Sequence, residues 1–234
     1  MKVIILAGGL GTRISEETMN KPKPMVQIAG RPIIWHLMRV FAVQGYDEFV
    51  IAAGYKGEVI YDWANKLKTN WKIEVVNTGL DTQTGGRIKK CMDLNPEERV
   101  FATYGDGLGN VNLKELLLFH EMNKLLGTVT AVRPPARFGV IQSVNGVVEH
   151  FGEKSQSESG WINGGFFVLE SKASELVFAD NEPFETGAIP RMVTNRQLSA
   201  YHHNGFWQPM DTLREKLDLE KFALLEQPPW MEIK

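Results

Sequence analysis

A glycine-rich segment near the N-terminus, ending in an arginine, has the residue types needed to bind phosphate. From Gly8 to Arg13 it reads Gly-Gly-Leu-Gly-Thr-Arg. Glycines let backbone N–H groups approach a phosphate closely, and a guanidinium can hold two phosphate oxygens at once. The segment fits neither the dinucleotide fingerprint, because Ile14 stands where the third glycine belongs, nor a Walker loop, because no Gly-Lys-Ser/Thr is present. It therefore predicts a triphosphate-binding loop, with a plain strand-to-helix turn as the alternative.

Two lysines follow this loop, each directly before a proline. Lys21 and Lys23 lie in Lys-Pro-Lys-Pro-Met, residues 21–25. Because proline disfavours helical backbone in the residue before it, we expect an extended strip that could lie along a triphosphate. The alternative is a solvated loop, since most surface lysines contact only water.

Two aspartates from distant segments could share a metal ion. Asp106 follows an apolar strand within Tyr-Gly-Asp-Gly, and Asp211 lies within Phe-Trp-Gln-Pro-Met-Asp-Thr. Magnesium prefers a few carboxylates together with phosphate oxygens, so both side chains could hold one ion beside a nucleotide if the fold brings them together. The alternatives are a turn residue at Asp106 and a helix N-cap at Asp211.

The elements that must position these residues alternate between strands and helices. The apolar run Val3–Ala7, directly before the glycines, predicts the central strand of a parallel sheet. Further strands are expected at 49–53, 73–76, 100–104 and 162–169, and helices at 32–45, 59–67, 88–92, 113–125 and 211–225. In the helix at 32–45 we expect Pro32 at the first helical position and Gly45 as a C-terminal cap. This alternation predicts an α/β fold with a doubly wound, mostly parallel sheet, which binds ligands beyond the carboxyl ends of its strands.

The pattern changes after residue 128. Apolar runs at 140–144 and 147–151 flank Asn145 and Gly146, a pair typical of a two-residue hairpin turn. We therefore expect a small antiparallel hairpin excursion from the sheet. Because no linker, repeat or low-complexity segment interrupts the chain, one domain spanning residues 1–234 is predicted.

Composition restricts the kinds of partner. The chain has 43% hydrophobic residues, 23% charged residues and a formal net charge of −2, so it has no general attraction to nucleic acid or to an anionic membrane. A phosphate site must therefore be a local cluster of positive charge. The single cysteine, Cys91, suits a reducing compartment, and no apolar run reaches membrane-spanning length. We expect a cytoplasmic protein that binds neither nucleic acid nor membrane.

The first motifs, read together as GGLGTR and PKPM, resemble the signature of the sugar-nucleotidyltransferase family. Its members make nucleoside diphosphate sugars from nucleoside triphosphates and sugar 1-phosphates. The resemblance implies a Rossmann-like nucleotidyltransferase fold and a homo-oligomer. It also implies that Arg13 binds the β- and γ-phosphates, that Lys23 stabilises the α-phosphate, and that Asp106 and Asp211 hold Mg²⁺. These four are the expected catalytic residues.

Later motifs resemble the branch of the family that joins CTP to glucose 1-phosphate. They are Thr-Gly-Gly-Arg at 84–87, Arg-Phe-Gly at 137–139, Ile-Asn-Gly-Gly-Phe-Phe at 162–167 and Phe-Trp-Gln-Pro-Met-Asp-Thr at 206–212. By this resemblance the nucleotide is bound by Leu6, Gly8, Gly9, Gly11, Thr12, Arg13, Lys23, Thr84, Gly85, Arg87, Thr103 and Gly105. The same resemblance implies that the sugar phosphate is bound by Gly139, Glu153, Lys154, Asn163 and Gly164.

Arg87 offers a test of the base from its chemistry. A guanidinium only donates hydrogen bonds, and cytosine presents two adjacent acceptors, whereas uracil and thymine carry a proton on N3 that would face another donor. A mismatched pair of donors costs roughly 1 to 3 kcal/mol per group. Arg87 therefore favours CTP over UTP or dTTP, unless it merely begins a helix and faces solvent.

The expected reaction is an in-line attack of the sugar phosphate on the α-phosphorus of the nucleotide, without a covalent enzyme intermediate. Catalysis would then depend on positioning and charge neutralisation. Another sugar or polyol phosphate, or UTP or dTTP, stays open as a substrate. A non-catalytic sensor of nucleotide sugars is a second alternative, and an oxidoreductase is disfavoured by the broken dinucleotide fingerprint.

Overall fold

The computed structural model describes residues 1–96, 98–135, 139–145, 147–153 and 160–233. The described strands are β1 Val3–Ala7, β2 Gln27–Ile28, β3 Arg31–Pro32, β4 Glu48–Ala53, β5 Lys72–Asn77, β6 Val100–Tyr104, β7 Gly107–Gly109, β8 Gly127–Val132, β9 Gly139–Val144, β10 Val147–Glu153, β11 Ile162–Asn163, β12 Phe167–Leu169, β13 Leu198–His203 and β14 Trp207–Pro209. The described α-helices are α1 Ser15–Thr18, α2 Ile33–Ala42, α3 Gly57–Lys66, α4 Thr84–Met92, α5 Leu113–Asn123, α6 Ala188–Thr194 and α7 Leu213–Ala223.

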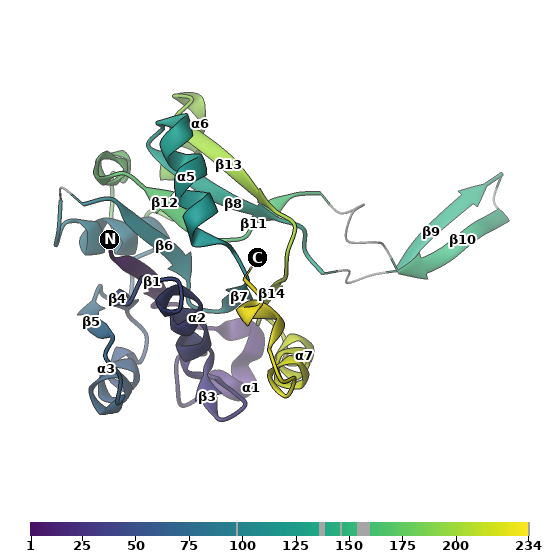
Figure 1. The fold of residues 1–234 in the computed structure, drawn as a ribbon, viewed down its shortest axis with the longest axis horizontal. Coiled ribbons are helices and arrows are strands. Elements are labelled where there is room, and N and C mark those ends of the chain that lie inside the picture. The colour runs from purple at the N-terminus through teal and green to yellow at the C-terminus, as the bar shows by residue number, and fades with distance from the viewer. Residues whose placement is uncertain (97, 136–138, 146, 154–159, 234) are drawn as a thin grey trace.

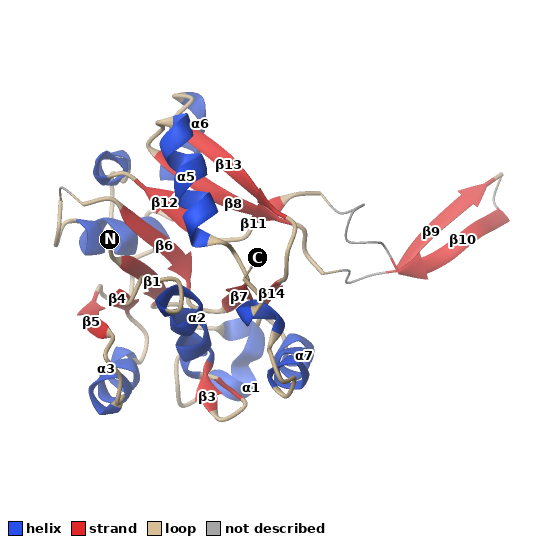
Figure 2. Ribbon diagram, in the orientation of Figure 1, coloured by secondary structure: helices blue, strands red, loops and turns tan. Residues whose placement is uncertain are grey.

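β1 lies inside the main sheet, as its apolar sequence predicts. All five of its residues are buried, and it pairs in parallel with β4 on one side and β6 on the other. Alternate side chains enter different cores: Val3 and Ile5 pack with α2 and α5, whereas Ile4 and Leu6 pack with α4 and α6. Helices therefore cover both faces of the sheet, which confirms the doubly wound α/β prediction (Figure 2).

The sheet is mixed beyond its parallel centre. Its strand order is β11-β8-β12-β6-β1-β4-β5, with β13 paired to β8. The pairs among β6, β1, β4 and β5 are parallel, and so is β13 with β8, whereas β12 runs antiparallel to both β6 and β8. Because β12 reverses direction between them, β8 and β13 run the same way as β6. Their carboxyl ends therefore lie at the same edge of the sheet as those of β1 and β6.

The single strand expected at 162–169 is wrong. The structure has two short strands, β11 and β12, separated by Gly164, Gly165 and Phe166. Gly165 and Phe166 have φ angles of 76° and 45°, so the backbone turns out of the extended conformation between the two strands. The helix expected at 32–45 is α2, which begins one residue later than expected because Pro32 is its extended N-cap. Gly45 follows this helix with φ 89°.

The predicted hairpin is present as β9 and β10. The strands pair antiparallel, with Gly139 opposite Glu153 and Val144 opposite Val147, and form a sheet of their own. In Figure 1 this hairpin stands apart from the main sheet. Gly146 of the expected turn lies outside the described residues, and Asn145 beside it has φ 53°.

Candidate active site

A second small sheet brings the two aspartates together. β7 directly follows the turn that contains Asp106, and it pairs antiparallel with β14, which ends just before Asp211. Pro209 lies opposite Gly107, and the Met210 N–H donates to the Asp106 carbonyl at 2.9 Å. The two carboxylates therefore come from the ends of two paired strands, although they are separated by more than a hundred residues in the sequence.

Lys23 lies between these carboxylates. Its Nζ is 2.6 Å from Oδ2 of Asp106 and 2.6 Å from Oδ1 of Asp211, while its side chain is only 9% exposed. Burial alone would lower the pKa of the Lys23 ammonium, but the two carboxylates more than offset this and hold the pKa above its ordinary value of 10.5. The lysine is therefore a buried cation, and the alternative of a solvated loop is wrong for Lys23.

The backbone at Lys23 is not the extended strip that the sequence predicted. Pro22 is extended, but Lys23, Pro24 and Met25 form one turn of 3₁₀-helix, closed by the Met25 N–H donating to the Pro22 carbonyl at 2.8 Å. Proline is compatible with the first residues of a helix, where no backbone N–H is needed. The turn directs Lys23 inward to the aspartates.

Asp211 is not a helix cap. The Thr212 hydroxyl caps α7 by accepting from the Glu215 N–H at 3.2 Å. In return, the Glu215 carboxylate accepts from the N–H groups of Thr212 at 3.0 Å and of Asp211 at 2.7 Å. The capping box thus holds the Asp211 backbone and leaves its carboxylate to join a charge cluster formed by Arg13, Lys23, Asp106 and Asp211. That carboxylate also pairs with Arg13 at 2.7 Å.

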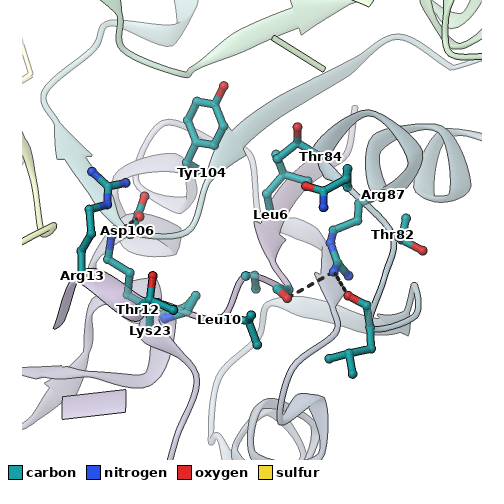
Figure 3. A pocket seen from close by; sticks show the side chains of 17 residues that line it. Leu6, Leu10, Thr12, Arg13, Lys23, Thr82, Thr84, Arg87, Tyr104 and Asp106 are labelled. Carbon is teal, nitrogen blue, oxygen red and sulfur yellow. Dashed lines mark hydrogen bonds and ion pairs between the residues drawn. The ribbon is translucent and has the colours of Figure 1, made fainter. Parts of the chain in front are cut away.

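A cavity of about 460 Å³ opens beside this cluster (Figure 3). Of the predicted nucleotide-binding and metal residues, those that line it are Leu6, Gly8, Gly9, Gly11, Thr12, Arg13, Lys23, Thr84, Arg87 and Asp106. Gly11 has φ 65°, and a Cβ placed there would lie 3.0 Å from the Cβ of Lys23, so glycine allows the loop to pack against the lysine. The structure therefore places the glycine-rich segment at residues 8–13, called the glycine loop below, around the same cavity as Lys23 and Asp106. Asp211 joins them through its contacts with Lys23 and Arg13.

Arg87 is buried in the first turn of α4 and does not face solvent. It is 4% exposed, and burial lowers the pKa of its guanidinium. The guanidinium donates to the carbonyls of Ala53 at 3.1 Å, Gly8 at 3.2 Å and Leu80 at 3.3 Å, and to the hydroxyl of Thr78. The four N–H groups on the two terminal nitrogens of the guanidinium thus all donate to protein atoms. Arg87 joins the glycine loop to the ends of β4 and β5.

Three residues predicted to bind the nucleotide support the cavity from behind and do not line it. The Gly85 N–H donates to the Glu182 carbonyl at 3.0 Å, and the Gly105 N–H donates to the Leu6 carbonyl at 2.9 Å. Thr103 is 2% exposed, and its hydroxyl accepts from the Phe166 N–H at 3.3 Å. Their polar groups therefore bind neighbouring segments of the protein.

The predicted sugar-phosphate residues are divided among three places. Asn163 donates at 2.9 Å to the hydroxyl of Tyr104, a residue that lines the cavity. Gly164 is packed behind it, with its N–H bound to Thr130 and its carbonyl bound to Trp207. Gly139 and Glu153 pair with each other in the hairpin, at the end opposite its turn. Lys154 lies outside the described residues.

Sequence reasoning did not single out Tyr104 or its hydrogen-bond partner Glu185. Tyr104 lines the cavity, and its hydroxyl donates to Oε1 of Glu185 at 2.5 Å. Oε2 of the same carboxylate accepts from the Thr84 hydroxyl at 2.7 Å. The position of Tyr104 at the end of β6, two residues before Asp106, was a usable signal. Glu185 follows no motif, and nothing in the sequence around it indicated this contact.

Within the described part of the chain, no helix is long and apolar enough to cross a membrane. The described residues also include no group of three or more histidine, cysteine, aspartate or glutamate side chains that could hold a metal ion without other ligands. A metal at this site would therefore need ligands besides Asp106 and Asp211.

The chain is similar to proteins of known activity over nearly its whole length. It is 39% identical over 253 residues to the glucose-1-phosphate cytidylyltransferase of Salmonella typhi, covering 98% of each chain. It is 37% identical to the probable glucose-1-phosphate cytidylyltransferase of Bacillus subtilis, covering 98% of this chain and 99% of that protein. Among solved structures, HddC from Yersinia pseudotuberculosis matches with a TM-score of 0.73 at 25% identity, over 94% of this chain and 99% of that one.

The fold is shared more widely than the sequence. A UDP-glucose pyrophosphorylase complexed with UDP-glucose superposes with a TM-score of 0.72 at 16% identity, over 94% of this chain and 97% of that one. The profile of the family described as Nucleotidyl transferase matches residues 2–223. This match covers the glycine loop, both aspartates and the strands that position them, so the chain belongs to the nucleotidyl transferase family.

Proposed function

We propose that this protein transfers the cytidylyl group of CTP to glucose 1-phosphate, giving CDP-glucose and pyrophosphate. The observation that carries the proposal is the contact of Lys23 with both Asp106 and Asp211 at 2.6 Å, beside a cavity lined by the glycine loop. The choice of CTP and glucose 1-phosphate is supported by the relatives from Salmonella typhi and Bacillus subtilis, whose names state that activity.

The glycine loop and Arg13 would hold the triphosphate. The loop carries no side chain at Gly8, Gly9 and Gly11, so its N–H groups can approach phosphate oxygens. Arg13 has a side chain that is 70% exposed, and it is anchored at one end by Asp211. A guanidinium in this position can reach the β- and γ-phosphates without first leaving a buried site.

Asp106 and Asp211 fit a divalent cation. Their carboxylates already converge on one positive group, the ammonium of Lys23, and hard oxygen ligands are those that Mg²⁺ prefers. Two carboxylates leave room in the coordination shell for phosphate oxygens and water. When bound, Mg²⁺ would neutralise charge on the reacting phosphates. Lys23 would then turn from the carboxylates toward the α-phosphate.

The chemistry is a displacement at the α-phosphorus. An oxygen of the sugar phosphate forms a bond to that phosphorus, the bond to the bridging oxygen breaks, and its electron pair leaves with pyrophosphate. No general base is required, because the attacking oxygen is already anionic. The reactants repel each other by about 4 kcal/mol for each pair of charges about 4 Å apart at an effective dielectric of 20. The cations of Lys23 and Arg13 reduce this repulsion.

A substrate matrix tests the proposal. CTP, UTP, dTTP, ATP and GTP are each combined with a panel of sugar 1-phosphates in the presence of Mg²⁺, and pyrophosphate release is measured. We expect the highest kcat/KM for CTP with glucose 1-phosphate. A higher value for another pair would reassign the substrates, whereas no release from any pair would contradict nucleotidyl transfer itself.

We further propose that the protein is a cytoplasmic homo-oligomer. Val144, Val147 and Val148 are exposed on the hairpin that stands apart from the sheet, and such apolar side chains favour contact with another surface. Light scattering coupled to gel filtration should give a mass of at least twice the 26.4 kDa of one chain. A monomer at micromolar concentration would contradict the assembly.

A further inference from the structure

A chain of hydrogen bonds runs along the cavity wall on the side of Tyr104. The Asn163 amide donates to the Tyr104 hydroxyl at 2.9 Å, and that hydroxyl donates to Oε1 of Glu185 at 2.5 Å. Oε2 of Glu185 accepts from the Thr84 hydroxyl at 2.7 Å. Glu185 thus joins the end of β6 to the start of α4, and both Tyr104 and Thr84 line the cavity.

The direction of each hydrogen bond in this chain follows from chemistry. The Gly165 N–H contacts the Asn163 side chain at 2.9 Å and can only donate, so the atom that faces it must be the amide oxygen. The amide nitrogen of Asn163 therefore faces Tyr104 and donates to it. A carboxylate only accepts, so the Tyr104 proton must point to Glu185.

With these directions fixed, the Tyr104 oxygen can only accept a further hydrogen bond. Its proton and one of its lone pairs are engaged, so it can present only a lone pair to a ligand. Burial, reinforced by the negative charge of Glu185, raises the pKa of Tyr104 well above its ordinary value of 10, so the hydroxyl keeps its proton. The Tyr104 hydroxyl is therefore a hydrogen-bond acceptor that has no proton to donate to a ligand.

The ring is also held in place. Gly165 lies against it, since a Cβ added there would come within 3.1 Å of Cδ2 of Tyr104, and Phe167 packs edge-on at a centroid distance of 6.1 Å. The position and polarity of the Tyr104 oxygen are therefore set before a ligand binds, which is the condition for selecting one substrate group over another.

The second substrate must approach from this side. In-line displacement places the attacking and leaving oxygens on opposite sides of the α-phosphorus. If the glycine loop holds the leaving pyrophosphate, the sugar phosphate enters from the opposite side of the cavity. In Figure 3 Tyr104 lies across the cavity from Thr12 and Leu10 of that loop.

We propose that Glu185 is a positioning residue that makes Tyr104 an obligate acceptor for one hydroxyl of the hexose in the sugar 1-phosphate. This inference rests on the proposed nucleotidyl transfer and adds a determinant of sugar selection to it. Glu185 does not line the cavity, and it acts through the Tyr104 oxygen.

The test uses sugar 1-phosphates in which single hydroxyls are replaced by fluorine, starting from the sugar that the substrate matrix identifies. Fluorine can accept weakly but cannot donate. At one ring position the wild-type protein should therefore reject the fluoro sugar, with kcat/KM lower by roughly 10- to 100-fold. In Glu185→Leu the Tyr104 proton is released and can point to the sugar, so this discrimination should fall below about threefold at the same position.

Three comparisons separate this role from general damage. Glu175→Leu, at an exposed glutamate of the 3₁₀-helix Ser171–Leu176, should leave the fluoro-sugar discrimination unchanged. Tyr104→Phe removes a single oxygen and should abolish the discrimination without any change at Glu185. In the Tyr104→Phe background, Glu185→Leu should change the KM for the sugar phosphate by less than about twofold, because non-additive effects mark residues that act together. The KM for CTP should change little in Tyr104→Phe and in Glu175→Leu, which leave the hydrogen bond between Glu185 and Thr84 in place.

The outcomes distinguish the two claims. Equal rejection of the fluoro sugars by wild type and Glu185→Leu, or effects of Glu185→Leu and Tyr104→Phe that simply multiply, would overturn the role of Glu185 while nucleotidyl transfer still stood. Absence of pyrophosphate release from wild type with every sugar 1-phosphate would overturn the proposed function and this inference with it.

Discussion

Lys23 is the residue whose replacement should affect stability and activity together. Lys23→Met keeps the length of the side chain but removes a buried ammonium that contacts two carboxylates at 2.6 Å. Removing one partner of a buried ion pair costs about 3 to 5 kcal/mol, and the lower end applies here because Asp106 is 31% exposed. For a domain of this size, about 3 kcal/mol corresponds to a fall in Tm of roughly 6 to 12 °C.

The loss of stability should depend on metal. Without Lys23, Asp106 and Asp211 repel each other, and a divalent cation would relieve that repulsion. We therefore expect the fall in Tm in the presence of EDTA and substantial recovery in the presence of Mg²⁺. Activity should not recover, because loss of a cation about 4 Å from the α-phosphate costs about 4 kcal/mol, or about a thousandfold in kcat.

Thermal unfolding with and without Mg²⁺, together with pyrophosphate release, measures both effects. Lys21→Met is a matched control, because Lys21 is 33% exposed and lies 3.8 Å from Glu17. It should change Tm by no more than about 2 °C, as expected for a partly exposed ion pair at a long distance. A Lys23→Met protein with kcat within a few-fold of wild type, or with the same fall in Tm in both solutions, would refute the reasoning.

Three further perturbations separate the roles of neighbouring residues. Asp211→Asn should reduce kcat by orders of magnitude and leave α7 intact, whereas Thr212→Ala should cost about 1 kcal/mol of unfolding free energy and leave kcat nearly unchanged; the reverse pattern would make Asp211 a cap. Arg87→Lys should lower the affinity for all nucleotides by a similar factor, because four of the guanidinium N–H groups donate to protein atoms. A change in the ratio of CTP to UTP activity would instead favour recognition of the base by Arg87. Urea unfolding from pH 7 to pH 5 should show declining stability, because burial lowers the pKa of His36, His120 and His203 below 6.5 and the unfolded chain takes up these protons first; a flat profile would contradict this.

The sequence predicted the position of the glycine loop well because the signals there are local. β1 is a continuous apolar run, and the glycines and Arg13 follow it directly, so burial and chain order together place the loop at the carboxyl edge of the sheet. The hairpin was similarly readable from its turn residues and the apolar runs on either side, which became β9 and β10.

The proximity of Asp106 and Asp211 could not be predicted from local sequence signals in the same way. It depends on β7 and β14, which are three residues each and too short to show a period. The N-cap of α7 is Thr212 and not Asp211, the residue that the sequence suggested. The cap is the residue whose side chain reaches the Glu215 N–H, and sequence patterns locate a helix end only to within about one or two residues.

Long-range packing decided the remaining differences. The sequence around Arg87 does not show whether its side chain is buried or exposed. In the structure, carbonyls from three separate segments accept hydrogen bonds from its guanidinium. The contact of Glu185 with Tyr104 joins positions 81 residues apart, and no periodic or turn signal marks it. Such contacts depend on the completed fold and have no local pattern.

The most direct test of the account is to count divalent ions at the charge cluster. Mn²⁺ is titrated into the protein with CTP, water-proton relaxation is recorded, and the same titration with CTP alone is subtracted. We predict one tightly bound Mn²⁺ per chain in wild type, with affinity lowered roughly tenfold or more in both Asp106→Asn and Asp211→Asn. Equal Mn²⁺ binding in all three proteins would contradict a metal site built from these two aspartates.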